Sequence, residues 1–126
     1  MIHHVSIGVR DLGAARRFYD AALAPLGYRC LHESPEYLGY GAETPRLWLN
    51  LTERPVAPDQ RSGLHFCFEA KDRKSVQGFH AAGVANGGRD NGRPGLRADY
   101  GPGYYAAFLI DPDGYRIEAY RDEPAS

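Results

Sequence analysis

The sequence has little cysteine. Cys30 and Cys67 are its two cysteines, and they stand far apart with no CxxC pair. Small disulfide frameworks and thiolate zinc sites both need several cysteines at characteristic spacings. The sequence therefore argues against both kinds of structure, and in the cytosol the two cysteines would be reduced thiols.

An excess of one charge and a long apolar run are also missing. Fifteen Lys and Arg residues stand against sixteen Asp and Glu residues, for a formal net charge of -1. Nucleic-acid binding needs a basic excess, and a membrane helix needs about eighteen consecutive apolar residues. The opening segment, MIHHVSIGVRDL, does not have the basic and then apolar pattern of a targeting peptide. We therefore expect a cytoplasmic protein without nucleic-acid or membrane partners.

The length of 126 residues fits one domain, near the lower end of what buries a self-sufficient core. We expect a single domain over 1–126, with a first module over 1–52, a linker over 53–62 and a second module over 63–126. The linker is predicted because TERPVAPDQRS is polar and rich in turn signals. A partner subunit would help to stabilise so small a core.

Two segments of the chain resemble two later segments. A shift of 61 residues lays HVSIGVRDLGAARRFYDAAL on HFCFEAKDRKSVQGFHAAGV and pairs His4 with His65. A shift of 68 lays YLGYGAETPRLWLN on YAAFLIDPDGYRIE and pairs Asn50 with Glu118. The second match also pairs Tyr37 with Tyr105 and Tyr40 with Phe108. Two matches in the same order predict a structural repeat.

Each half shows the same order of predicted elements. In the first half a strand over 3–9 alternates apolar and polar residues, Asp11 caps a helix that ends at Gly27, and strands follow over 28–33, 37–41 and 47–51. In the second half the corresponding elements are a strand over 64–70, a helix over 72–82, a strand after Val84, and strands over 104–110 and 115–120 joined by the turn DPDG. The fold class is therefore α+β, with two βαβββ modules.

Strand parity places three metal-binding side chains on equivalent faces. Successive residues of a strand point to opposite faces, so His4, His65 and Glu118 each point away from the apolar residues that pack under a helix. Two imidazoles and one carboxylate are a normal ligand set for Zn, or for Fe, Mn or Ni where positions stay open for a substrate. The metal would act as a Lewis acid or lower the pKa of a bound water.

A structural role is the competing interpretation of each of these residues. A lone histidine on a strand is more often structural than a ligand, but equivalent histidines in two related modules favour a ligand role. Glu118 could be a solvated edge residue, although an apolar strand seldom keeps a carboxylate on its inner face without a partner. We do not expect His3, His32 or His80 to be ligands.

The segments HHVSIGVRDLGAARRFYDAALAPLGY, GLHFCFEA and FLIDPDGYRIEAY together resemble the vicinal oxygen chelate superfamily. This superfamily includes glyoxalase I, bleomycin-resistance proteins, fosfomycin-modifying thiol transferases and extradiol dioxygenases. The resemblance implies a cupped, partly open mixed β-barrel with helices on the outside and one divalent metal ion inside. It also implies a homodimer whose two chains share sheets or sites, and it carries the metal ligands over to His4, His65 and Glu118.

The fourth strand departs from the glyoxalase I pattern. A second carboxylate takes part in proton transfer there, whereas the repeat places Asn50 opposite Glu118, and an amide cannot act as a general base near neutral pH. A slip of two would place Trp48 there instead. Glu118 then remains as the expected catalytic carboxylate.

Several functions stay open. The first hypothesis is a divalent-metal-dependent glyoxalase-like enzyme, of lyase/isomerase or thiol-transferase type, that acts on a small oxygen-bearing substrate. The alternatives are an extradiol-type dioxygenase, with Tyr100, Tyr104, Tyr105 or Tyr120 as an acid-base group, and a non-catalytic drug-binding protein. A thiol transferase would use Arg93, Arg97 or Arg116 for an anionic substrate.

The predicted substrate pocket extends around the three ligands. Five further residues are predicted to line this pocket. Strand parity and the possible roles of a tyrosine as an acid-base group and of an arginine as a cation predict Trp48, Asn50, Cys67, Tyr105 and Arg116. The segment 87–103 is rich in Gly, Arg and Asp and is either a lid or disordered.

Overall fold

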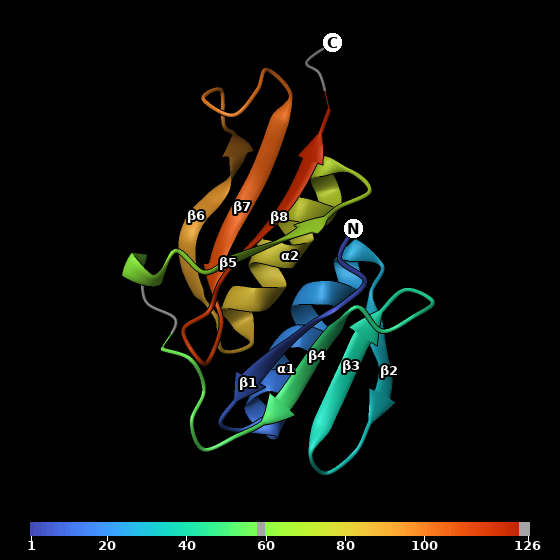
Figure 1. Ribbon diagram of the computed structural model, residues 1–126. Coiled ribbons are helices and arrows are strands. Elements are labelled where there is room, and N and C mark those ends of the chain that lie inside the picture. The colour runs from blue at the N-terminus through green and yellow to red at the C-terminus, as the bar shows by residue number, and fades with distance from the viewer. Residues whose placement is uncertain (58–59, 124–126) are drawn as a thin grey trace.

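The computed structural model describes residues 1–57 and 60–123 (Figure 1). Pro58 and Asp59 of the predicted linker and the last three residues, 124–126, lie outside the described residues. The first module consists of β1 (Val5–Val9), α1 (Leu12–Leu23), the 3-10 helix η1 (Ala24–Leu26), β2 (Arg29–Glu33), β3 (Tyr37–Gly41) and β4 (Leu47–Leu51). The second module consists of β5 (His65–Glu69), α2 (Arg73–Ala85), β6 (Arg89–Leu96), β7 (Tyr104–Ile110) and β8 (Arg116–Asp122), preceded by the 3-10 helix η2 (Gln60–Ser62).

Each module forms a four-stranded mixed sheet. The strand orders are β1-β4-β3-β2 and β5-β8-β7-β6, so the first strand of each module lies at an edge and pairs in parallel with the last strand. The two sheets are cupped but are not closed into a barrel. The predicted α+β fold of two βαβββ modules is confirmed.

The helices begin as the sequence predicts. The Asp11 carboxylate accepts a hydrogen bond from the Ala14 N–H at 3.1 Å, and the Asp72 carboxylate accepts one from the Ser75 N–H at 2.7 Å. Each aspartate thereby satisfies an N–H that the first helical turn leaves without a partner. The shift of 61 residues between the two modules therefore holds in three dimensions through the first strand and the helix.

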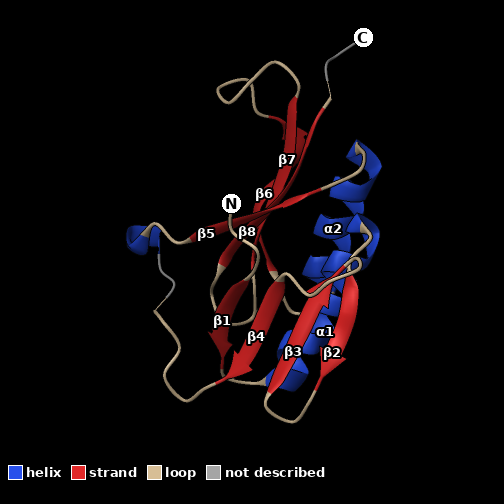
Figure 2. Ribbon diagram, turned by 45° about the vertical axis from the view of Figure 1, so that its right-hand side comes forward, coloured by secondary structure: helices blue, strands red, loops and turns tan. Residues whose placement is uncertain are grey.

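The helices join the two modules. Helix α1 packs on the first sheet, α2 packs on the second, and the two helices contact each other (Figure 2). The largest fully buried side chains come from both modules: Tyr19, Tyr40, Tyr115, Phe18, Phe79, Leu23, Leu49, Leu109, Ile117, Val9 and Val76. One apolar core therefore lies beneath both sheets, and we call the opposite, uncovered side of each sheet its open face.

The turn between β7 and β8 binds the second module to the first. Tyr19 of α1 donates a hydrogen bond from Oη to Oδ2 of buried Asp111 at 2.5 Å, and Tyr115 donates from Oη to the Gly8 carbonyl at 2.6 Å. The Arg10 N–H donates to Asp113 Oδ1 at 3.0 Å. Burial raises the pKa of Asp111 to about 6, although its hydrogen bonds act in the opposite direction. The DPDG turn is thus part of an inter-module junction.

Strand β6 occupies about half of the segment 87–103, which the sequence predicts to be a lid or disordered. Arg89–Leu96 pairs with β7, so only 97–103 remains as a connection. Its pairing is irregular around Gly92, where φ is 152°, and Pro94 lies on this sheet edge. Glycine and proline weaken a strand signal in the sequence and are tolerated at an edge, which explains the difference.

Candidate metal and substrate site

His65 and Glu118 lie together on the open face of the second sheet. The Nε2 atom of His65 is 3.0 Å from Oε1 of Glu118, and the Glu118 side chain is almost completely buried. Strand β8 lies between β5 and β7, so the neighbours of Glu118 across the sheet are Cys67 on β5 and Phe108 on β7. A buried carboxylate needs polar partners, and this histidine is one of them.

Tyr104 is the second partner of Glu118. Its Oη donates a hydrogen bond to Glu118 Oε2 at 2.5 Å. Burial and this hydrogen bond raise the pKa of Tyr104, which keeps its hydroxyl protonated. Among the four tyrosines considered from the sequence, Tyr104 thus hydrogen-bonds a predicted ligand. Parity alone could not single it out, because Tyr104 is paired with Asp122, four residues beyond Glu118.

Cys67, on β5, lies beside Glu118 of β8. Desolvation and the neighbouring carboxylate raise the pKa of the thiol to about 12. The protonated thiol is a poor nucleophile near neutral pH. Cys67 therefore lines this site next to Glu118.

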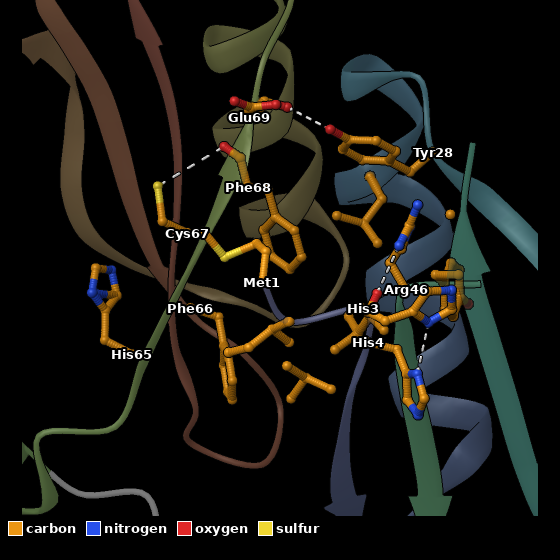
Figure 3. A pocket seen from close by; sticks show the side chains of 16 residues that line it. Met1, His3, His4, Tyr28, Arg46, His65, Phe66, Cys67, Phe68 and Glu69 are labelled. Carbon is orange, nitrogen blue, oxygen red and sulfur yellow. Dashed lines mark hydrogen bonds between the residues drawn. The ribbon is translucent and has the colours of Figure 1, made fainter. Parts of the chain in front are cut away.

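His4 does not join His65 and Glu118 within one chain. It lies just before β1, and its Nδ1 is 2.9 Å from Nδ1 of His3. His4 and His65 line the same cavity of about 640 Å³ between the modules, and Figure 3 shows them on opposite sides of it. Within 1–57 and 60–123, no three His, Cys, Asp or Glu side chains form a group that could hold a metal ion.

The pairing of β4 changes which residue corresponds to Glu118. Ser6 pairs with Trp48 in the first sheet, and Cys67, which corresponds to Ser6 by the shift of 61, pairs with Glu118 in the second. Trp48 therefore occupies the position equivalent to Glu118. Asn50 pairs with Gly8, one step further along the same face, so the match of Asn50 to Glu118 was wrong by two residues.

An aromatic cluster surrounds Trp48 on the open face of the first sheet. The rings of His32 and Tyr37 are stacked, with centroids 5.2 Å apart and an interplanar angle of 7°. The Trp48 ring meets both at steep angles, with centroid distances of 5.6 Å to His32 and 5.8 Å to Tyr37. The ring fits because Gly39 has no side chain: a Cβ there would lie 2.7 Å from Trp48 Cζ3.

Two other predicted pocket residues lie in different places. Tyr105 points to the helix-covered face, where its Oη accepts a hydrogen bond from Gln77 Nε2 at 3.0 Å and the Arg73 guanidinium lies 5.0 Å from its ring centre. It is separated from Glu118 by the sheet, so it is not near the site. Arg116 is half-buried, pairs with His65 across the sheet and shares the face of Glu118 by parity.

These features define a class of protein: paired βαβββ modules whose open faces carry histidine and carboxylate side chains. The profile of the Glyoxalase/Bleomycin resistance protein/Dioxygenase superfamily matches residues 1–119, and the chain belongs to this superfamily. The resemblance seen in the sequence is thereby confirmed.

Two solved structures share this fold, and a sequence relative spans 93% of the chain. A glyoxalase/bleomycin resistance protein from Albidiferax ferrireducens T118 has a crystal structure with a TM-score of 0.77 and 34% identity, over 93% of this chain and 95% of that one. The Bacillus subtilis (strain 168) protein YqjT, described as uncharacterized, is 29% identical over 93% of this chain and 95% of its own. A glyoxalase-related enzyme from Fulvimarina pelagi shares the fold at 19% identity, with a TM-score of 0.73 over 95% of this chain and 86% of that one. No helix in the described part of the chain is long and apolar enough to cross a membrane.

Proposed function

We propose that the chain is a divalent-metal-dependent glyoxalase-like enzyme, of lyase/isomerase or thiol-transferase type, that acts on a small oxygen-bearing substrate. The observation that carries this proposal is the buried Glu118 carboxylate, which lies 3.0 Å from His65 Nε2 and is held at its other oxygen by Tyr104. A carboxylate and an imidazole this close, with the carboxylate oriented by a further donor, are suited to bind one cation.

The proposed ligands are His65, Glu118 and His4. Two of them fit a cation as they stand, whereas His4 belongs to the other module and does not meet them within one chain. We propose a homodimer in which His4 of one chain completes the site formed by His65 and Glu118 of a second copy. This arrangement is supported by β1 and β5, which are edge strands of their sheets, because the outer backbone groups of an edge strand are available to a partner chain.

The ion, which would be Zn, Mn, Ni or Fe, would supply Lewis acidity toward adjacent substrate oxygens. The chain's own residues have separate roles. Glu118 is the proposed proton acceptor as well as a ligand, because Trp48 stands where a second carboxylate would be and Asn50 cannot act as a base. Tyr104 keeps the Glu118 carboxylate oriented, and the Cys67 side chain lies next to Glu118 across the sheet.

A drug-binding protein without catalysis is the competing function. The aromatic cluster at His32, Tyr37 and Trp48 is the observation that favours it, since large aromatic surfaces also suit the binding of bulky planar compounds. Such a protein would need neither the buried Glu118 nor its histidine partner. Metal content therefore separates the two functions.

The test is elemental analysis of protein that has been purified without a nickel column and loaded with each candidate metal. We expect one metal per chain in the wild type, loss of metal in His65→Ala, and retention in His80→Ala. His80 is a matched control because it bonds Asp90 at 2.8 Å, away from Glu118. Circular dichroism would confirm that each variant is folded. Wild-type protein without bound metal, and unchanged by His65→Ala, would contradict the enzyme proposal.

Mixing variants tests whether two chains share the site. His4→Ala and His65→Ala each lack one ligand, but a mixed dimer would contain one site in which His4 comes from one chain and His65 and Glu118 come from the other. We expect unmixed variants without metal and one metal per mixed dimer. A mixture that stays without metal, although native mass spectrometry detects the mixed dimer, would show that the ligands do not come from two chains.

A further inference from the structure

His3 and His4 direct their rings toward each other, although they are neighbours in sequence. Adjacent residues of a regular strand point to opposite faces, and this rule would separate the two imidazoles. In the structure both residues precede β1, and their Nδ1 atoms are 2.9 Å apart with an angle of 90° between the ring planes (Figure 3). Both residues are exposed. Strand parity therefore gives no reason to exclude His3 as a ligand beside His4.

The distance between the two Nδ1 atoms suits the binding of one cation. A divalent metal ion such as zinc lies about 2.0 to 2.1 Å from an imidazole nitrogen. Two such bonds to atoms 2.9 Å apart enclose an angle of about 90° at the ion. This is the angle between neighbouring ligands in octahedral and square-planar coordination, which Mn, Ni and Cu ions adopt. The pair therefore has the geometry of a bidentate ligand.

Arg46 holds the backbone on both sides of His4. Its guanidinium Nη1 donates a hydrogen bond to the His3 carbonyl at 3.0 Å, and its own carbonyl accepts one from the Val5 N–H at 2.9 Å. The segment that carries the two imidazoles is thus attached to the residue before β4. A bidentate group that is fixed before it binds loses less freedom on binding than a mobile one.

The proposed metal site lacks a fourth protein ligand. His65 and Glu118 supply two donor atoms, and His4 of a second copy would supply a third. In the first sheet the position equivalent to Glu118 holds Trp48, whose indole nitrogen is a hydrogen-bond donor only and cannot bind a metal. A fourth protein ligand would therefore have to come from outside the paired strands. His3 lies there, next to a ligand that is already proposed.

We infer that His3 is a metal ligand together with His4, so that one chain provides both histidines as a bidentate group and the second copy provides His65 and Glu118. This inference rests on the proposed function for the roles of His65 and Glu118, whereas the pairing of His3 with His4 is seen within a single chain. Three imidazoles and one carboxylate would leave two positions of an octahedral ion open for the adjacent oxygens of a substrate.

Metal affinity is the first measurement. Chelator competition with Ni(II) compares the wild type with His3→Ala, His4→Ala and His65→Ala. We expect the affinity to fall by about 100-fold or more in each variant, because even the loss of a group that only orients a ligand costs about 10- to 100-fold. His80→Ala is the matched control and should bind as the wild type does, since His80 bonds Asp90. Circular dichroism and native mass spectrometry would confirm that each variant is folded and dimeric.

Counting the bound imidazoles separates a ligand from a residue that only orients His4 through a hydrogen bond. Pulsed electron paramagnetic resonance of protein loaded with one equivalent of Cu(II) per chain reports the imidazoles at the ion. We expect three in the wild type and two in His3→Ala. Two imidazoles in both proteins would overturn the inference, even if the affinity falls.

The same variants separate this inference from the proposed function. Metal that is lost in His65→Ala but is bound by His3→Ala with unchanged affinity and imidazole count would overturn the inference and leave the proposed function intact. Metal that depends on His3 and His4 but is unchanged in His65→Ala would support the bidentate pair and contradict the proposed function. Wild-type protein that binds no metal would contradict both.

Discussion

Replacing Asp111 by Asn changes the charge of the junction between the modules with little change in its shape. The carboxylate oxygen Oδ1 accepts hydrogen bonds from the N–H groups of Asp113 and Tyr115 at 2.9 and 2.8 Å, and an amide oxygen can accept both. The amide nitrogen would face the Tyr19 hydroxyl. Asp111→Asn therefore resembles the protonated acid at every pH.

The magnitude follows from the raised pKa of Asp111. Burial raises it from 3.8 to about 6, so the folded state binds the proton more tightly than the unfolded chain does. Protonation of Asp111 therefore stabilises the fold fully below pH 3.8, and this contribution is lost as the pH rises through 6. The difference between the pKa values in the unfolded and folded states corresponds to about 3 kcal/mol of folding stability in total. About 2 kcal/mol of this stability is lost between about pH 4.5 and about pH 7.5.

Guanidinium unfolding of wild type and Asp111→Asn at these two pH values measures the effect. The free energy of unfolding of the variant, relative to the wild type, should rise by about 2 kcal/mol from the lower to the higher pH. Taking the difference cancels the titration of other groups. A relative stability that is constant with pH, with unchanged denaturant slopes, would refute the argument from a buried carboxylate.

Tyr19→Phe should show the opposite trend with pH. It removes the donor to Asp111 Oδ2, which should lower the free energy of unfolding by about 1.5 to 3 kcal/mol at about pH 7.5 and by less at about pH 4.5. Tyr28→Phe is the control, because Tyr28 donates to the Glu69 carbonyl at 2.9 Å and also links the modules without a carboxylate. Its effect should be the same at both pH values.

Two further predictions concern single contacts. Tyr104→Phe removes the hydrogen-bond donor to Glu118 Oε2. The metal affinity, measured by chelator competition, should therefore fall about tenfold. An unchanged affinity would show that the hydroxyl does not position the carboxylate. Gly83 lies in α2, and Gly83→Ala would add a Cβ 2.4 Å from Leu109 Cδ1. The free energy of unfolding, measured by chemical denaturation, should therefore fall by about 1 to 3 kcal/mol. A rise of about 1 kcal/mol, as helix propensity alone would give, would mean that the core relaxes around the methyl group.

The fold and the faces of several strands could be predicted because they depend on local patterns. Alternation placed Val5, Ile7 and Val9 against the helices, and the same alternation placed Glu118 on the open face. The two aspartate caps were also local signals. The role of Asp111 was different: its partner Tyr19 is 92 residues away in sequence, so no local pattern could connect them.

The wrong placement of Asn50 opposite Glu118 comes from the second repeat match, which crosses a turn without a gap. The strand pairing relates Tyr40 to Leu109 by a shift of 69 and Leu47 to Ile117 by a shift of 70, because the hairpin of the second module has one more residue between these pairs. The shift of 68 was thus wrong by one residue in β7, and a one-residue slip exchanges the two faces of a strand. The match thus pairs Tyr37, which lies on the open face, with Tyr105, which lies under the helices.

In β4 the same match was wrong by two residues, and a slip of two keeps the face while it changes the position along the strand. Parity therefore gave the correct face for Trp48 and Asn50 but could not decide which of them stands at the position of Glu118. Only the pairing of Ser6 with Trp48 decides it. The two modules thus share a fold but differ in chemistry at equivalent positions: a carboxylic acid stands in the second module and an indole in the first.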